Sequence, residues 1–229
     1  MGQPQRPRRR LAVVAPSTSK GTLVVIEGAD DIGRSTHIHL LKHWLERSGH
    51  GVVETSTAQS VVAGKGLKKA RAGHMLGGLT MSLFYATAFA DQLERDVKPA
   101  LRAGFVVLMD RYTYSLMASA AIRGADAQWL KRVYSFAPTP DLVIYLRTNV
   151  DALVSRVVNT TGFNYWESGM DLRLGDDLFD SFVEYQGRLL TALDAMASKH
   201  RFHVVDAAGN VDAVADTLQS LVAPLLVRT

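Results

Sequence analysis

The sequence predicts an α/β protein in which a parallel sheet carries helices on both faces. Short runs of β-branched and other apolar residues alternate with longer segments of helical period after residue 21. The runs at 105–109 and 142–146 contain only apolar residues, as expected of strands that are covered on both sides. Strands separated by helix-length segments form βαβ units, so we expect a doubly wound parallel sheet.

The expected elements follow this alternation in chain order. The first strand is expected at 22–26, and a glycine-containing turn leads from it to a helix over 34–47, which Gly49 and Gly51 end. A second strand begins at 52–53, and a long helix over 79–102 stops at Gly104. The remaining strands are expected at 105–109, 142–146 and 202–205, and the remaining helices at 151–158, 177–199 and 211–225.

The basic charge of the chain is concentrated at its start. The 26 basic and 22 acidic residues give a net charge of +4. Residues 1–20 contain five of the basic residues and no acidic one, so 21 basic and 22 acidic residues remain, a net charge of −1. We expect a basic disordered tail over 1–20, with an organelle transit peptide as the alternative, and one domain over 21–229. Nucleic acid is not an expected partner, apart from phosphate contacts that the tail could make.

Two absences in the sequence exclude whole classes of protein. The chain has no cysteine, which excludes disulfides, thiolate metal sites and a cysteine nucleophile. No apolar run approaches the roughly 18–20 residues that a membrane helix needs. We therefore expect a cytoplasmic protein without membrane contact.

The strongest local pattern lies directly after the first expected strand. It reads Gly28-Ala29-Asp30-Asp31-Ile32-Gly33-Arg34-Ser35-Thr36 and matches the spacing G-x-x-x-x-G-K-[ST], with Arg34 in the place of lysine. Glycines let the backbone N–H groups face a polyphosphate, and the following helix presents its positive end to the same phosphates. Ser35 can place its hydroxyl on Mg²⁺. The pattern predicts an ATP site; a chance glycine-rich turn is the less favoured alternative, because spacing and context agree.

Arginine at position 34 keeps the positive charge but changes its shape. Lysine is a compact point charge, whereas the guanidinium of arginine is a wide planar fork. Such a fork can still hold phosphate through a bidentate contact. We expect Arg34 to take part in catalysis. Either the loop is reshaped to suit arginine, or turnover is slower with arginine than with lysine.

A second pair of candidate residues ends the strand at 105–109. Asp110 is the carboxylate that a phosphate-loop enzyme uses to order Mg²⁺, and Arg111 follows it at the carboxyl end of the sheet, where ligands of open α/β folds bind. An arginine there can stabilise charge in the transition state of phosphoryl transfer. The alternative, an Asp-Arg pair that caps the next helix, is weaker once the phosphate loop is considered.

With these motifs, the chain resembles the thymidylate kinases, a family of P-loop nucleoside monophosphate kinases. The resemblance covers about residues 21–226 and includes the segments 27–36, 83–86, 98–101, 104–115, 140–146 and 205–207. It implies a P-loop NTPase-type sheet of five parallel strands in the order 2-3-1-4-5. It also implies a homodimer and transfer of the γ-phosphoryl group of Mg-ATP to dTMP.

The resemblance assigns a role to each matching residue. Asp30 would lie near the acceptor sugar and the metal, and Phe84 would stack on the acceptor base. Asp110 would order the Mg²⁺ shell, Arg111 would hold the acceptor phosphate near the donor, and Ser115 would lie beside the acceptor pocket.

Two segments without a motif of their own are placed by the resemblance. Residues 159–171 would form the lid, and the loop from Asp206 would pass the adenine. The aromatic residues Phe163, Tyr165 and Trp166 would either close over a nucleotide or dock the segment on the core.

The departures from the family pattern remove cations and polar groups from the acceptor side. Asp31 stands where the family has glycine, and Ala88 stands where it has arginine. Ser119-Ala120 replaces the family's Tyr-Gln pair. Residues 54–57 replace an Arg-Glu-Pro segment whose arginine grips the acceptor phosphate, and the lid segment lacks the arginines of many relatives. Each lost charge-assisted contact removes roughly 1.5–3 kcal/mol of binding. Replacement cations are available in a basic segment that contains Lys65, Lys68, Lys69 and Arg71, although a solvated helix face is the favoured reading of this segment.

Three functional readings follow. A kinase that converts dTMP to dTDP is the leading one, and a kinase for a different nucleotide acceptor is second because the thymine-reading residues are missing. The third is a catalytically weak relative that binds nucleotide as a regulatory subunit. A zinc site at His39 and His43, which are four residues apart, lacks a third ligand, so surface histidines are favoured.

Overall fold

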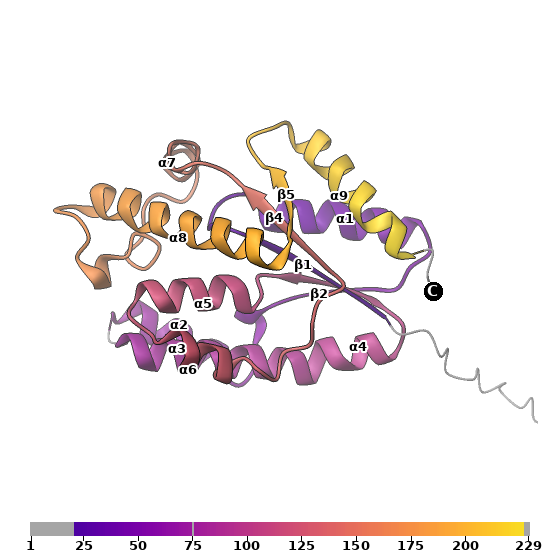
Figure 1. Cartoon of the computed structure of the whole chain (residues 1–229), viewed down its shortest axis with the longest axis horizontal. Helices are drawn as coiled ribbons and strands as arrows, with labels where there is room; N and C mark the ends of the chain where they lie inside the picture. The colour runs from indigo at the N-terminus through magenta and orange to yellow at the C-terminus, as the bar shows by residue number, and fades with distance from the viewer. Residues whose placement is uncertain (1–20, 75, 227–229) are drawn as a thin grey trace, which may run out of the picture.

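The computed structural model describes residues 21–74 and 76–226, so the expected tail over 1–20 lies outside the described residues. Its centre is one five-stranded sheet in the order β2-β3-β1-β4-β5 (Figure 1), with every neighbouring pair parallel. The predicted fold class and strand order are therefore confirmed. The strands are β1 (Thr22–Gly28), β2 (Val52–Ser56), β3 (Val106–Asp110), β4 (Leu142–Arg147) and β5 (His203–Asp206).

Helices cover both faces of the sheet, as the alternation of elements predicts. The α-helices of the described part are α1 (Arg34–Arg47), α2 (Gly64–Ala72), α3 (Gly78–Gln92), α4 (Lys98–Arg102), α5 (Thr113–Ile122), α6 (Ala127–Val133), α7 (Val150–Asn159), α8 (Leu178–His200) and α9 (Val211–Leu226). Shorter turns are the 3₁₀ segments Thr57–Gln59 and Met170–Leu172, and a π-helical segment covers Leu93–Val97.

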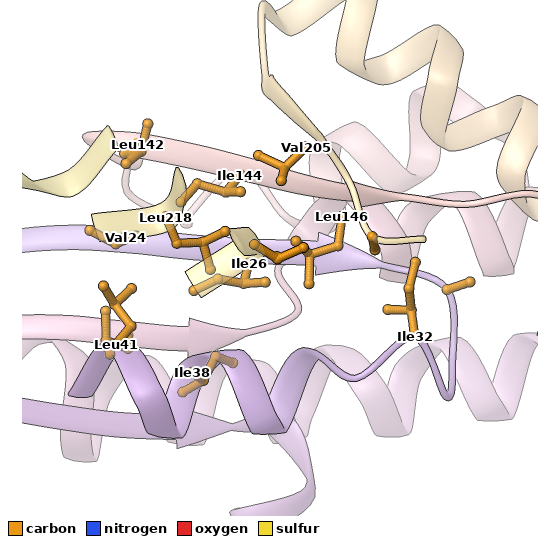
Figure 2. Packing of buried hydrophobic residues seen from close by; sticks show 14 of the residues in the cluster. Val24, Ile26, Ile32, Ile38, Leu41, Leu142, Ile144, Leu146, Val205 and Leu218 are labelled. Atoms are coloured by element: carbon orange, nitrogen blue, oxygen red, sulfur yellow. The ribbon is translucent and has the colours of Figure 1, made fainter. Parts of the chain in front are cut away.

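Strand β1 shows why the sheet is buried on both sides. Its side chains alternate: Val24 and Ile26 pack with α1, α7 and α9, whereas Leu23 and Val25 pack with α3, α5 and α6. All four are at most 1% exposed. Figure 2 shows the first of these clusters, where side chains of β1 and β4 meet those of α1 and α9. Burial on both faces explains the unbroken apolar runs in the sequence.

The observed boundaries differ from the predicted ones in a few places. β3 begins at Val106 instead of 105: the carbonyl of Phe105 accepts from the N–H of Thr22, but its own N–H donates to the carbonyl of Ala100 in α4 rather than to a neighbouring strand. The expected helix over 79–102 consists of α3, the π-helical segment and α4 in succession. The sequence predicts no range for α5 or α6. α5 is rich in alanine and serine and has little apolar contrast between its faces, and α6 has only seven residues.

None of the helices in residues 21–74 and 76–226 is long and apolar enough to cross a membrane. The carboxyl ends of the five parallel strands meet at one edge of the sheet, where the turns into α1, α5 and α7 begin. The candidate site is built at this edge.

Candidate active site

The turn between β1 and α1 has the backbone that its sequence demands. Gly33, directly before α1, has a φ of 89°, and Asp31 has a φ of 56°. Both values lie in the left-handed region, which glycine enters freely and aspartate tolerates better than most residues. A Cβ on Gly28 would lie 3.0 Å from the carbonyl oxygen of Leu146. Ile32 is buried in the core and anchors the middle of the turn (Figure 2).

Arg34 bridges this turn to the end of β3. Its Nη1 donates hydrogen bonds to the carbonyl oxygens of Gly28, at 2.7 Å, and of Ala29. Its Nε donates to Oδ1 of Asp110 at 2.6 Å, and its side chain is only 10% exposed. Two residues that the sequence predicts as catalytic, Arg34 and Asp110, are therefore in direct contact. A phosphate must exchange some of these contacts for its own oxygens before Arg34 binds it bidentately.

Ser35 and Asp110 form an oxygen-rich corner next to the turn. The Oγ of Ser35 donates to Oδ2 of Asp110 at 3.2 Å. Mg²⁺ prefers hard oxygen ligands and is usually held by one or two protein groups, with water and phosphate filling its other positions. These two side chains fit that requirement, although no cluster of three or more His, Asp and Glu side chains suited to a metal occurs in the described part of the chain. Thr36 lies beside them and is exposed.

Arg111 and Asp30 form the second ion pair of the site. Nη2 of Arg111 contacts Oδ1 of Asp30, and the N–H of Arg111 donates to the carbonyl of Ile26 at 3.0 Å. Burial works to raise the pKa of Asp30, but the charges of Arg111 and Arg34 outweigh it and lower that pKa below its usual value. Nε of Arg111 is buried and has no hydrogen-bond partner among the described residues, so this donor can bind an anionic ligand.

A small cavity of about 30 Å³ adjoins Arg111 on the side expected for the acceptor. Ser115 lines it, as the resemblance implies, and so does Tyr85. Phe84, the expected stacking residue, is not among its lining residues: a Cβ on Gly66 of α2 would lie 3.3 Å from the Phe84 ring. A nucleotide base needs far more room than this cavity offers.

The lid segment is docked on α2 and α8 through its aromatic residues. Trp166 is 7% exposed and its Nε1 donates to the carbonyl of Arg71 at 2.8 Å. Tyr165 stacks on His74 with 3.8 Å between ring centroids, and Phe163 packs on Phe182 of α8. In this conformation the aromatic residues dock the segment, which is the second of the two readings offered for them.

Arg123 connects α5, the lid segment and α8, although it belongs to no motif in the sequence. Its Nε and Nη2 donate to both oxygens of Asp171, and Nη2 also donates to the carbonyl of Trp166. Its Nη1 donates to Ser119 Oγ and to the hydroxyl of Tyr185. The side chain is 4% exposed. Ser119, which stands where the family has tyrosine, thus serves this network.

Arg156 of α7 is a second residue without a sequence signal. Its Nη1 donates to the carbonyl of Ile32 at 2.8 Å, and its Nη2 donates to the carbonyl of Ala207 at 2.9 Å. It therefore joins the phosphate turn to the loop after Asp206, the loop expected to pass the adenine. An isolated arginine on an amphipathic helix resembles any solvent-exposed charge, so only the tertiary contacts identify it.

Glu27, the last side chain before Gly28, is fully buried. Its Oε1 accepts from the N–H groups of Tyr112 and Ser115 at the start of α5, at 3.0 and 3.2 Å. Burial raises the pKa of Glu27, which the hydrogen bonds from Ser115 and the charges of Arg34 and Arg111 only partly oppose. This carboxyl group holds the Asp110–Arg111 turn against β1.

The histidine pair does not belong to this site. His39 and His43 lie on an exposed face of α1 with their Nε2 atoms 2.9 Å apart. No third ligand completes a cluster with them in the described ranges.

Comparison with known proteins gives a consistent result. Residues 26–218 match the family model described as thymidylate kinase. The chain is 34% identical over 181 residues to a protein named probable thymidylate kinase 2 from Saccharolobus solfataricus, covering 79% of this chain and 84% of the relative. It is 35% identical over 179 residues to a probable thymidylate kinase from Thermococcus gammatolerans, covering 74% and 79%. It is 29% identical over 211 residues to a thymidylate kinase from Jannaschia sp., covering 87% and 94%.

Proposed function

The chain belongs to the thymidylate kinase family, and from that premise we propose that it transfers the γ-phosphoryl group of ATP to dTMP, giving dTDP. The observation that carries the proposal is the turn between β1 and α1, with Arg34, Asp110 and Arg111 converging beside it. Phosphoryl transfer needs little covalent chemistry from the protein and depends on positioning and charge stabilisation, which this arrangement supplies.

The donor and the acceptor are assigned to opposite sides of the Asp110–Arg111 turn. ATP binds along the phosphate loop, residues 28–36, whose backbone amides and Arg34 neutralise its phosphates. The acceptor lies beside Asp30, Arg111 and Ser115, with Phe84 as the stacking residue once the cavity opens. Arg111 offers its unpaired Nε to the transferring group, since that donor has no partner among the described residues.

Ser35 and Asp110 are the residues that would hold Mg²⁺. The ion supplies charge neutralisation at the phosphate oxygens when it is bound. Because Asp110 pairs with Arg34 through one oxygen and with Ser35 through the other, both of its oxygens have partners to exchange before they order a metal shell.

The remaining parts of the proposal concern the whole chain. We assign residues 21–229 to one domain, with a basic tail before it, and a cytoplasmic location. We also assign a homodimer, for which Leu79 and Leu83 are the supporting observation: they lie one turn apart on α3 and are 64% and 47% exposed. Nucleotides are the assigned small-molecule partners, and contacts with nucleic acid are assigned at most to the basic tail.

A panel of acceptors tests the proposed reaction. Purified protein, ATP and Mg²⁺ are combined in turn with each nucleoside monophosphate, and ADP release is measured in a coupled assay. We expect turnover with dTMP and little with the others. Turnover with a different monophosphate alone would show that this nucleotide, and not dTMP, is the acceptor. Stabilisation by ATP in a thermal shift assay, without turnover on any acceptor, would instead identify a nucleotide-binding regulatory protein.

A further inference from the structure

The end of β2 supplies no cation to the acceptor side of the site. Residues 54–57 read Glu-Thr-Ser-Thr, in place of the segment that carries an arginine in the resembling family. Glu54 faces Lys42 of α1, with 3.7 Å between Oε2 and Nζ, and Thr55 donates a hydrogen bond to Gln92. A phosphate dianion that enters beside Asp30 must therefore find its positive partner elsewhere.

Arg34 and Arg111 are each already paired with a carboxylate, although Nε of Arg111 has no hydrogen-bond partner among the described residues. Arg34 pairs with Asp110, and Arg111 pairs with Asp30. Asp31 and Glu167 add two further carboxyl groups to the same region. Burial raises the pKa of Glu167, and the charges of Asp30 and Asp31 raise it further. A phosphate bound in this region would therefore be stabilised by a third cation.

Arg71 is the cation that the fold brings to this place. It lies near the C-terminal end of α2 and is about one-third exposed. Its Nη2 lies 4.0 Å from Oε1 of Glu167, the longest ion pair of the site, and its charge contributes to lowering the pKa of Asp30. The carbonyl of the same residue accepts the hydrogen bond of Trp166, which fixes its backbone against the lid segment.

The other basic residues of α2 are placed differently. Lys65, Lys68 and Lys69 are exposed, and of the four only Arg71 approaches the carboxylates of the site. The sequence presents these residues as one basic segment, and the fold separates Arg71 from the rest.

We propose that Arg71 binds the phosphate group of the acceptor nucleotide together with Arg111, and so replaces the arginine missing after β2. Glu167 is the partner that Arg71 gives up when the phosphate arrives. Because Trp166 of the lid segment holds the backbone of Arg71, docking of the lid segment and binding of the phosphate would favour each other. This assignment rests on the proposed function, since it presumes a nucleoside monophosphate as the second substrate.

The test compares binding of a monophosphate with binding of its nucleoside. Isothermal titration calorimetry would measure dTMP and thymidine against wild type, Arg71→Ala, Arg71→Lys and Lys68→Ala, with Lys68 as the matched exposed control on the same helix. We expect Arg71→Ala to weaken dTMP binding roughly 10- to 100-fold and to leave thymidine binding unchanged. Arg71→Lys should restore part of the loss, and Lys68→Ala should bind like wild type.

Three results would overturn the assignment in distinguishable ways. Wild-type affinity of Arg71→Ala for dTMP would show that Arg71 does not touch the phosphate. An equal loss for dTMP and thymidine, or a changed KM for ATP, would show that Arg71 only supports the lid segment. If wild type binds no nucleoside monophosphate at all, the proposed function fails, and the assignment fails with it.

Discussion

The guanidinium of Arg34 contacts two carbonyl groups of the phosphate turn and the carboxylate at the end of β3. A lysine ammonium is a single point and cannot span these three acceptors in the same way. The contacts indicate a turn that is adapted to arginine, rather than one in which arginine is merely tolerated.

Substitutions at Arg34 test this adaptation. We expect Arg34→Ala to abolish ATP binding, because the cation of the turn is removed and Asp110 loses its partner. Arg34→Lys should lower the melting temperature of the ligand-free protein and should not raise kcat above the wild-type value. Thermal melting, ATP titration and steady-state kinetics measure these effects. A large gain in kcat for Arg34→Lys would contradict adaptation and point to a degraded site.

The buried carboxyl group of Glu27 predicts a pH dependence of stability. Its pKa is raised from an ordinary 4.5, so the folded state holds this proton more tightly than the unfolded chain does. The stability that this provides is present below pH 4.5 and is lost as the pH rises through the raised pKa. Glu27→Gln keeps the acceptor oxygen for Tyr112 and Ser115 but cannot ionise. Urea unfolding at a series of pH values should therefore show that the free energy of unfolding of Glu27→Gln rises relative to that of wild type as the pH rises. A difference between the two that does not change with pH would contradict this.

The lid segment, α5 and α8 meet at one buried ion pair. Asp171, in the short Met170–Leu172 turn, accepts two hydrogen bonds from Arg123, which is almost fully buried. A buried charge that loses its partner remains desolvated and uncompensated, whereas an exposed pair contributes little. Loss of the Asp171 carboxylate would therefore leave the charge of Arg123 buried without its ionic partner.

A comparison of two Asp→Asn substitutions tests the effect of that loss. Asp171→Asn should lower the free energy of unfolding by roughly 2–3 kcal/mol. The control Asp194→Asn breaks the exposed pair with Arg147, whose side chain is 55% exposed, and should cost less than about 1 kcal/mol. Chemical denaturation of both variants beside wild type gives the two values. Equal losses would show that burial of Arg123 does not decide the strength of this contact.

The long helical stretch before β3 illustrates how an element can match its expected ends and still differ inside. Its predicted range of 79–102 agrees closely with the observed ends at Gly78 and Arg102, but residues 93–97 form a π-helical turn. Such turns are frequent near functional sites. Here the turn directly follows Gln92, a fully buried residue that contacts Thr55 at the end of β2.

At the scale of the whole molecule, the exposed apolar stripe on α3 is the surface that we assign to the dimer. Leu79 and Leu83 are 64% and 47% exposed and lie one turn apart, so together they form an apolar patch that a second copy of the chain could cover. The wild-type protein is expected to have twice the chain mass at micromolar concentration, and Leu83→Glu should be monomeric. Light scattering coupled to size-exclusion chromatography measures both. A monomeric wild-type protein would exclude the dimer. A dimeric Leu83→Glu variant would show that the dimer interface lies on another surface.

The sequence by itself determined the layers of the fold and the donor side of the site. Apolar periodicity depends on neighbours along the chain, so β1, β3 and β4 could be read from local pattern, as could the long helices α1, α3, α7, α8 and α9. The spacing of the phosphate turn and the position of Asp110 and Arg111 at a strand end are also local. Parallel pairing then necessarily brings these strand ends to one edge of the sheet, where Arg34 meets Asp110 and Arg111 meets Asp30.

Only the tertiary structure decided which charged residues on the acceptor side act together. Arg71 and Glu167 are far apart in the chain, as are Arg123 and Asp171, and neither pair belongs to a pattern with fixed spacing. Tyr85, rather than the expected Phe84, lines the small cavity beside Arg111. The physical reason is the same in each case. A side chain's contacts depend on the rotation of its helix and on the element that packs over it, and these are set by packing across the whole core rather than by the residues next to it.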